Sequence, residues 1–110
     1  MEIAPKKKGE KTVAGVKGRL DAVSAPAFEN ELLGLIEEGE RWIVLDFSEL
    51  DYVSSAGLRS ILAVAKRIRA EKGELEVAAL QEEVKRVFDV SGFSTILPIF
   101  DSVGAAITRK

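Results

Sequence analysis

The sequence predicts a single α/β domain built on a mostly parallel sheet, and three observations lead to this prediction. The chain has 110 residues, the usual size of one domain, and 46% of them are hydrophobic while 31% are charged. Strand-like apolar segments alternate with segments whose apolar residues recur at helical spacing. Helical crossovers between successive strands make those strands mostly parallel. We therefore expect a mixed, mostly parallel sheet of four to five strands with about four helices.

The first elements are a strand, a polar connection and a helix. Residues 12–20 combine β-branched with small residues and predict a strand, and a shorter strand is expected at residues 2–4. Ser24 is a suitable N-cap for the helix that follows, Pro26 is tolerated in its first turn, and Gly39 can end it. The expected buried stripe of this helix is Phe28, Leu32, Leu35 and Ile36.

The middle of the chain predicts a buried strand and a second helix. The continuous apolar run at residues 42–45 is typical of a strand that is covered on both faces. Residues 46–53 are more polar, and we expect a loop there. The second helix begins at residues 54–57 and ends near Gly73. Its expected buried stripe is Leu58, Ile61, Leu62, Ala65 and Ile68.

The last third of the chain repeats the strand-helix pattern twice. A strand is expected at residues 75–80, followed by a third helix that ends near Gly92. Residues 96–100 predict the last strand, and a short final helix is expected to begin at Asp101 or Ser102.

One domain is expected to occupy residues 12–110, since neither a repeat nor a linker interrupts them. The preceding segment, residues 1–11, contains the run Lys6-Lys7-Lys8. We expect this segment to form either a short N-terminal strand or a basic, solvated tail.

The composition excludes several classes of function. The chain has 16 Lys and Arg and 18 Asp and Glu residues, so a net charge of −2 gives it no general attraction to nucleic acid or an anionic membrane. It has no His and no Cys, which removes the Ser-His-Asp triad, thiol nucleophiles and His or Cys metal ligands. We expect no cofactor and no bound metal.

No apolar run approaches the roughly 20 residues that span a bilayer, and no secretory signal is recognisable, so we expect a cytoplasmic protein.

Polar residues follow several of the predicted strands. Because the carboxyl ends of parallel strands meet at one edge of a sheet, and because ligands bind at that edge, we expect the function to reside there. The residues expected at this edge are Asp21, Ser48, Asp51, Ser54, Ser55 and Gln81.

The most distinctive segment of that edge is residues 51–59, Asp-Tyr-Val-Ser-Ser-Ala-Gly-Leu-Arg. Ser54 and Ser55 stand at the start of a helix, where unpaired amides and the helix dipole favour an anion such as phosphate. Gly57 has no Cβ and can admit a partner close to the backbone. Arg59 lies one helical turn after Ser55, where it can brace an anion. A purely structural interpretation explains the same residues: the serines as helix caps, Gly57 as a packing residue, Arg59 as a solvated side chain and the aspartates as turn formers. The structural and the functional interpretation both remain open.

Residues 43–58 resemble the signature of the STAS domain, the family of the anti-sigma factor antagonists. This segment is Ile-Val-Leu-Asp-Phe-Ser-Glu-Leu-Asp-Tyr-Val-Ser-Ser-Ala-Gly-Leu. Residues 18–21, Gly-Arg-Leu-Asp, are similar to an early Gly-x-Leu-Asp turn of the family, and residues 84–93 are similar to its third helix and the glycine that ends it. The resemblance extends over residues 12–107 and implies a single α/β STAS domain.

The resemblance also implies a protein-binding switch. In the family, the unmodified domain binds an anti-sigma factor that is also a GHKL-type serine kinase, and this binding frees a sigma factor. The kinase phosphorylates the antagonist on a serine at the start of the second helix, and a phosphatase resets it. By position, the resemblance implies Ser55 as the phospho-acceptor. Ser54 is the alternative, because the family often has Asp at this position and here a second hydroxyl stands next to Ser55. The implied partner-binding residues are Asp21, Asp51, Ser54, Ser55, Gly57 and Arg59.

Two other kinds of function are compatible with the sequence. The same domain can be the STAS subunit of a lipid-transport ATPase or of a stress-sensing complex, without phosphorylation. An enzyme is disfavoured because Ser55 has no His as its base and because Lys66 and Lys72 lie far along the helix. Asp21 with Asp51 is the remaining formal candidate for a carboxylate pair or a metal site. We therefore expect a regulatory binding module and not an enzyme.

Overall fold

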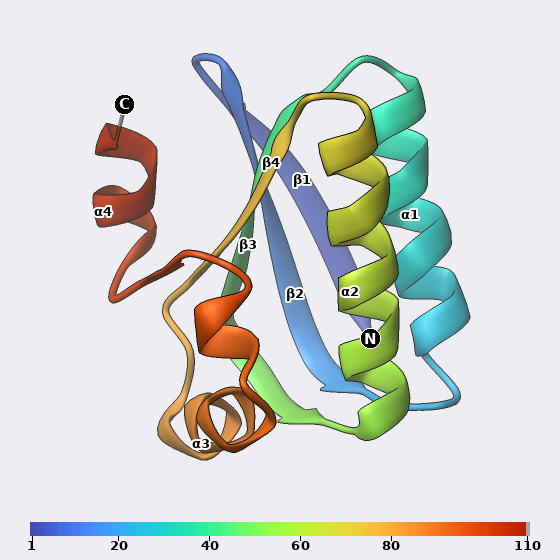
Figure 1. Cartoon of the computed structure of the whole chain (residues 1–110), viewed down its shortest axis with the longest axis vertical. Coiled ribbons are helices and arrows are strands. Elements are labelled where there is room, and N and C mark those ends of the chain that lie inside the picture. The colour runs from blue at the N-terminus through green and yellow to red at the C-terminus, as the bar shows by residue number, and fades with distance from the viewer. Residues whose placement is uncertain (110) are drawn as a thin grey trace.

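The computed structural model describes residues 1–109, which form one five-stranded sheet in the order β1-β2-β3-β4-β5 (Figure 1). The pairs β2-β3, β3-β4 and β4-β5 are parallel, and only the edge strand β1 is antiparallel to its neighbour. This confirms the predicted α/β fold with a mixed, mostly parallel sheet. The strands are β1 (Glu2–Lys8), β2 (Lys11–Leu20), β3 (Trp42–Val53), β4 (Glu74–Ala78) and β5 (Ile99–Phe100).

The described part of the chain, residues 1–109, contains four helices that pack around the sheet. Helices α1 and α2 lie side by side on one face, α4 lies on the other face, and α3 lies at the end of the sheet from which the parallel strands lead into their helices (Figure 1). No helix in residues 1–109 combines the length and the apolarity that crossing a bilayer requires. The helices are α1 (Ala25–Glu37), α2 (Ser55–Ala70), α3 (Glu82–Ser91) and α4 (Val103–Thr108), with a 3₁₀ turn η1 (Phe93–Thr95) after α3.

The two faces of the sheet bury different cores. The larger core lies under α1 and α2 and contains residues such as Phe28, Leu32 and Ile61, none of which has any exposed surface. Phe88 of α3 closes one end of this core and contacts Phe47 and Phe93 edge to face. The smaller core lies under α4, where Ala106 packs with other buried residues of the sheet: Val13, Val44 and Ala78.

Residues 46–53 form strand and not the expected loop. They continue β3 to Val53 and stay paired with β2, but the register shifts twice, between Gly15 and Lys17 and between Gly18 and Arg19. At each shift β3 carries one more residue than β2, which is the pattern of a β-bulge. The buried residues therefore recur at intervals of three, at Phe47, Leu50 and Val53. This spacing hides the alternation by which strands are identified from sequence.

The lysine run at the N-terminus belongs to β1 and is not a tail. The expected strand at residues 2–4 continues to Lys8, and the three lysine side chains are exposed. The Nζ of Lys7 lies 2.5 Å from Oε1 of Glu40. A lysine-rich strand at the edge of a sheet discourages pairing with the edge of another sheet, because like charges would face each other.

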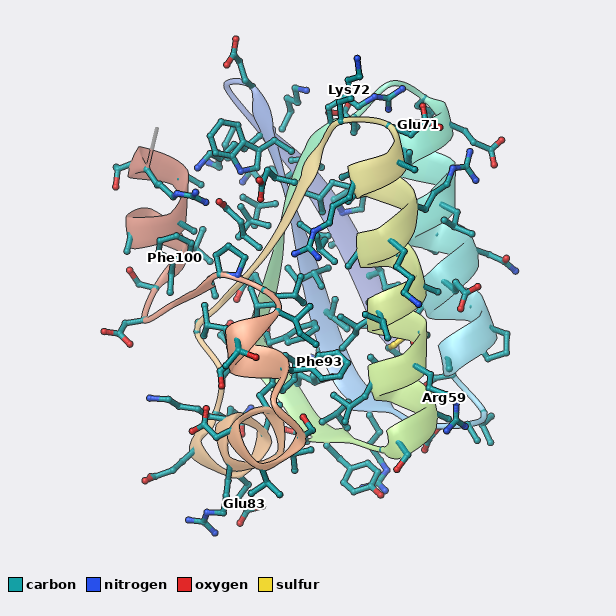
Figure 2. All side chains as sticks on the ribbon, in the orientation of Figure 1. Arg59, Glu71, Lys72, Glu83, Phe93 and Phe100 are labelled. Carbon is teal, nitrogen blue, oxygen red and sulfur yellow. The ribbon has the colours of Figure 1, made fainter. Side chains whose placement is uncertain are left out.

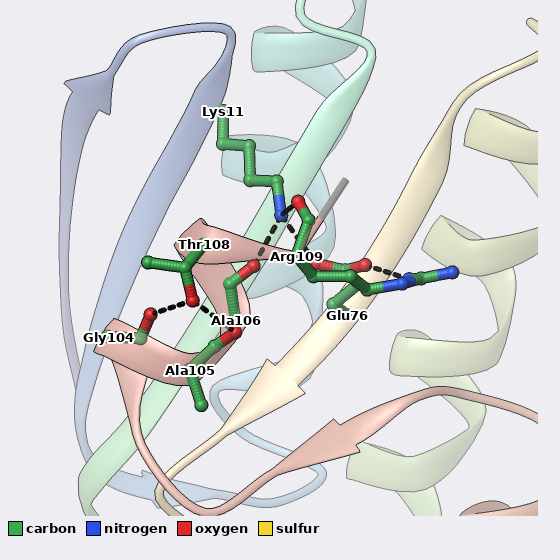
Figure 3. A network of polar contacts seen from close by, with 7 residues as sticks. All are labelled: Lys11, Glu76, Gly104, Ala105, Ala106, Thr108 and Arg109. Carbon is green, nitrogen blue, oxygen red and sulfur yellow. Dashed lines mark hydrogen bonds and ion pairs between the residues drawn. The ribbon is translucent and has the colours of Figure 1, made fainter.

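Helix α4 is held against the sheet by buried charged side chains (Figure 3). Lys11 Nζ donates hydrogen bonds to the carbonyl oxygens of Ala106 and Arg109, the latter at 3.0 Å. The same Nζ lies 3.6 Å from Oε1 of Glu76 and 3.9 Å from the ring centre of Trp42. Glu76 is fully buried and forms a second ion pair with Arg109. The network therefore joins β2, β4 and the C-terminal helix.

Candidate functional site

Ser54 is the N-cap of α2. Its backbone is extended, with φ −99° and ψ 175°, and its hydroxyl oxygen accepts a hydrogen bond from the Gly57 N–H at 3.2 Å. The Ser54 N–H donates to the carbonyl of Leu20 at 2.9 Å, which fixes the start of α2 beside the end of β2. The Ser54 hydroxyl therefore satisfies an otherwise unpaired helix amide, as the cap interpretation predicts.

Ser55 is the first residue of α2, and its side chain is exposed. Within residues 1–109 its hydroxyl has no hydrogen-bond partner. The two adjacent hydroxyls thus differ in their surroundings, since one is used for capping while the other faces solvent at the positive end of a helix of 16 residues. An anion attached at Ser55 would be stabilised by that end of the helix.

Gly57 is buried and does not open the backbone to a partner. A Cβ at this position would lie 2.5 Å from the Leu20 carbonyl oxygen and 2.9 Å from Leu20 Cγ. The space left by the missing side chain is occupied by the end of β2. Of the two interpretations of Gly57, this geometry favours the packing glycine, which allows α2 to begin directly against Leu20.

The loop between β2 and α1 is organised by Asp21 and not by a Ser24 cap. Asp21 Oδ1 accepts hydrogen bonds from the N–H groups of Val23 and Ser24, at 3.0 and 3.1 Å. The Ser24 hydroxyl donates to the Arg19 carbonyl at 2.7 Å and makes no cap bond to α1. The expected Ser24 cap is thus absent because the turn preceding the helix already uses its hydroxyl.

These hydrogen bonds lower the pKa of Asp21, with the bond from the Ser24 N–H making the largest contribution and partial burial opposing it. A carboxyl whose pKa is lower in the folded than in the unfolded chain stabilises the fold above its unfolded pKa, and the effect is lost as the pH falls through the folded value. We expect Asp21→Asn to unfold at a lower temperature than the wild type at neutral pH. The difference should shrink as the pH falls below about 4. Calorimetry of both proteins against pH measures this, and the exposed Asp89→Asn serves as the matched control.

Two exposed side chains that the sequence analysis did not single out lie at the same end of the sheet. Tyr52 of β3 is 40% exposed, and the guanidinium carbon of its cross-strand neighbour Arg19 lies 4.1 Å from its ring centre. Val23, in the loop before α1, is 90% exposed. Tyrosine and arginine are enriched among the residues that dominate binding at protein interfaces, so the stacked Arg19 and Tyr52 side chains are typical of a docking surface.

The remaining predicted residues form two smaller groups. Gln81, just before α3, donates to the Ser48 carbonyl at 3.0 Å and to Asp51 Oδ1 at 3.4 Å, which joins α3 to the end of β3. Asp51 and Asp21 therefore belong to separate hydrogen-bonding groups. Residues 1–109 contain no cluster of three acidic side chains that could hold a metal ion. These observations give no support to a carboxylate pair or a metal site at this edge.

Arg59 lies on the outer surface near the start of α2 (Figure 2). It is one helical turn after Ser55. It belongs to no ion pair within residues 1–109. A shallow groove of about 400 Å³ runs beside it between the starts of α1 and α2. The groove is lined by Ala22, Ala25, Pro26, Glu29, Asn30, Ala56, Arg59 and Ser60.

Comparison with known proteins places this site in a family. Residues 2–106 match the STAS domain. The candidate anti-sigma factor antagonist BtrV of Bordetella bronchiseptica is 44% identical over 94 residues, which cover 86% of this chain and 81% of BtrV. A crystal structure of a candidate anti-sigma factor antagonist from Thermotoga maritima has a TM-score of 0.91 at 20% identity, covering 96% of this chain and 92% of that one.

The same fold occurs in SpoIIAA of Bacillus with and without its phosphate. The unphosphorylated anti-sigma factor antagonist has a TM-score of 0.73 at 16% identity, covering 97% of this chain and 94% of SpoIIAA. The phosphorylated form has a TM-score of 0.75 at 20% identity, and 98% of each chain is covered. With the family match over nearly the whole chain and the BtrV identity, the resemblance seen in the sequence is confirmed: the chain belongs to the STAS domain family.

Proposed function

We propose that this protein is an anti-sigma factor antagonist that binds an anti-sigma factor with serine kinase activity, and that phosphorylation of Ser55 switches the binding off. The observation that carries the proposal is the contrast between the two serines. Within residues 1–109, the hydroxyl of Ser55 is exposed and has no hydrogen-bond partner at the start of α2, whereas that of Ser54 accepts the capping hydrogen bond from Gly57. Ser55 is therefore the more accessible acceptor.

The named relatives support a regulatory role. BtrV and SpoIIAA are named as antagonists of anti-sigma factors, and a phosphorylated form of SpoIIAA has been solved. The protein is accordingly a regulatory binding protein and not an enzyme. In the proposal it acts in the cytoplasm, where the unmodified form occupies the anti-sigma factor and releases the sigma factor.

The proposed modification is a phosphoryl transfer from ATP bound by the partner kinase. Ser55 Oγ attacks the γ-phosphorus, the bond to the bridging oxygen of ADP breaks, and the hydroxyl proton passes to a base of the kinase. Hydrolysis of the phosphoserine by a separate phosphatase returns the hydroxyl and releases inorganic phosphate. Because helix amides at the start of α2 stabilise the added charge, the fold tolerates the phosphate and the effect is confined to docking.

The docking surface in this proposal surrounds Ser55. It comprises the exposed Val23, the stacked Arg19 and Tyr52 side chains, and Arg59 beside the groove. Asp21 holds the loop that presents Val23, and Asp51 is part of the group that positions α3. In this arrangement the two aspartates shape the surface, while the exposed valine, tyrosine and arginines make the contacts.

The test is phosphorylation by candidate GHKL-type kinases from the same genome, supplied with ATP. We expect intact-mass analysis to show one added phosphate on the wild type and on Ser54→Ala, and none on Ser55→Ala. Ser54→Ala should lower stability by about 1 kcal/mol through loss of the cap, which thermal unfolding records separately. Phosphate on Ser55→Ala, mapped to Ser54, would contradict the assignment. A kinase that binds the protein without modifying it would contradict the phosphorylation switch.

A further inference from the structure

Helices α1 and α2 carry opposite charges on neighbouring surfaces. The ionisable residues of α1 are all acidic, namely Glu29, Glu31 and Glu37, and no basic residue occurs in this helix. Those of α2 are all basic and comprise Arg59, Lys66, Arg67 and Arg69. The two helices lie side by side on one face of the sheet (Figure 1), so the outer surface of this layer has an acidic half and a basic half.

Within residues 1–109, the three glutamates of α1 and three of the four basic residues of α2 belong to no ion pair. None of the ion pairs within residues 1–109 joins α1 to α2. Arg67 pairs with Glu71 at 3.6 Å and Arg69 donates to the Ile96 carbonyl at 2.6 Å, but Arg59 and Lys66 belong to no ion pair in this part of the chain. On α1, Glu37 stands in the last turn, where a negative charge is unfavourable for the helix dipole. Helix stability therefore does not account for this charge.

The spacing of the charges is matched between the two helices. Arg59 is the fifth residue of α2 and Glu29 the fifth of α1, while Lys66 is the twelfth of α2 and Glu37 the thirteenth of α1. At a rise of 1.5 Å per residue, the basic pair is separated by roughly 10 Å and the acidic pair by roughly 12 Å along their helices. Both helices run in the same direction (Figure 1). A surface of this kind is complementary to a copy of itself.

We propose that two copies of this chain associate through the α1–α2 surface. When the twofold axis runs along the helices, α1 of each copy faces α2 of the other, and Arg59 meets Glu29 of the second copy while Lys66 meets Glu37. Because the dimer has twofold symmetry, each of these ion pairs occurs twice in the interface. An axis across the helices would instead place α1 on α1, with like charges opposed. Charge complementarity thus selects one of the two symmetric arrangements.

The residues between the charged rims allow a close approach. On α1, Pro26 lines the groove that faces α2, whereas Ala27 and Gly34 line the groove beside Pro5 of β1. Ala63 and Ala70 lie on α2. The surface of the two helices measures roughly 20 by 20 Å, about half of the ~800 Å² that each partner buries in a standard interface. The dimer is therefore weak, reversible and sensitive to salt.

Self-association has a consequence for the switch. Ser55 is the first residue of α2, which forms half of the proposed dimer surface. A second copy on this surface and a partner docked at Ser55 therefore exclude each other. This consequence rests on the proposed function, whereas the self-association itself does not. Dimerisation would compete with partner binding, so dimers of the unmodified protein would dissociate as the partner becomes available.

The experiment is sedimentation equilibrium of the full chain from micromolar to millimolar concentration. In low salt we expect the weight-average mass to rise from 11.9 kDa towards twice that value, and the rise to disappear in high salt. Arg59→Glu/Lys66→Glu and Glu29→Lys/Glu37→Lys should each remain monomeric. Combining all four changes in one chain restores opposite charges on the two helices and should restore association. Circular dichroism verifies that each variant is folded.

The control is Lys85→Glu/Arg86→Glu, which makes the same charge change on exposed positions of α3. It should associate like the wild type. A mass of 11.9 kDa for the wild type at every concentration in low salt would overturn the proposal. A dimer that survives the helix charge reversals, or a fourfold variant that stays monomeric, would overturn it as well. None of these results depends on whether a kinase modifies Ser55.

Discussion

Replacing Ser55 by aspartate is expected to weaken binding of the anti-sigma factor by about a thousandfold while leaving the fold intact. The carboxylate mimics part of the charge of a phosphate at an exposed position that an interface would dehydrate. A new unpaired charge in such a contact costs several kcal/mol, and each 1.4 kcal/mol corresponds to a factor of ten in the dissociation constant. Isothermal titration calorimetry with the purified kinase, in the absence of ATP, measures the loss.

The matched control is Ser102→Asp. Ser102 is also exposed and also stands at the start of a helix. It is the N-cap of α4 on the opposite face of the sheet, and its hydroxyl accepts from the Ala105 N–H at 3.0 Å. Aspartate is as good a cap as serine, so this variant adds the same charge without loss of stability. It should bind like the wild type. Equal affinities of Ser55→Asp and the wild type for the kinase would show that Ser55 does not lie in the interface.

Replacing Glu76 by glutamine is expected to destabilise the protein by about 3–5 kcal/mol, because removing one partner of a buried ion pair leaves the other charge without compensation. Glu76 has no exposed surface, and the side chain of Lys11 is only 5% exposed. The variant would leave the Lys11 ammonium buried against Trp42 with two carbonyl oxygens as its remaining partners. Urea unfolding followed by circular dichroism measures the change.

Two further variants separate charge burial from other effects. Glu71→Gln breaks exposed ion pairs with Arg41 and Arg67 and should cost less than about 1 kcal/mol. Lys11→Met/Glu76→Met removes both buried charges together and should recover much of the stability lost by Glu76→Gln, since an apolar pair can replace a buried ion pair. If Glu76→Gln were no more costly than Glu71→Gln, the buried network would not be what holds α4.

Much of the site could be predicted from local sequence. The exposed serine at the start of α2 follows from a cap residue, a glycine and an apolar stripe within a dozen positions, and such patterns depend on helix geometry alone. The strand and helix order followed in the same way from apolar periodicity. The role of Ser24 could not be predicted, and the two interpretations of Gly57 could not be separated, because each residue depends on the end of β2: Leu20 fills the space beside the glycine, and the Arg19 carbonyl accepts from the serine.

The order of the elements, the class of the sheet and the position of Ser55 are encoded in residues that are neighbours along the chain, where one helical turn or one strand repeat sets the distance. Local sequence does not encode the strand over residues 46–53 or the Lys11–Glu76 ion pair, because each arises only after separate strands have been placed side by side. Two β-bulges disrupt the apolar alternation of β3, and the buried lysine becomes favourable only beside a glutamate from β4 and the carbonyl groups of α4. Long-range pairing of this kind is a property of the assembled sheet, and no local pattern carries it.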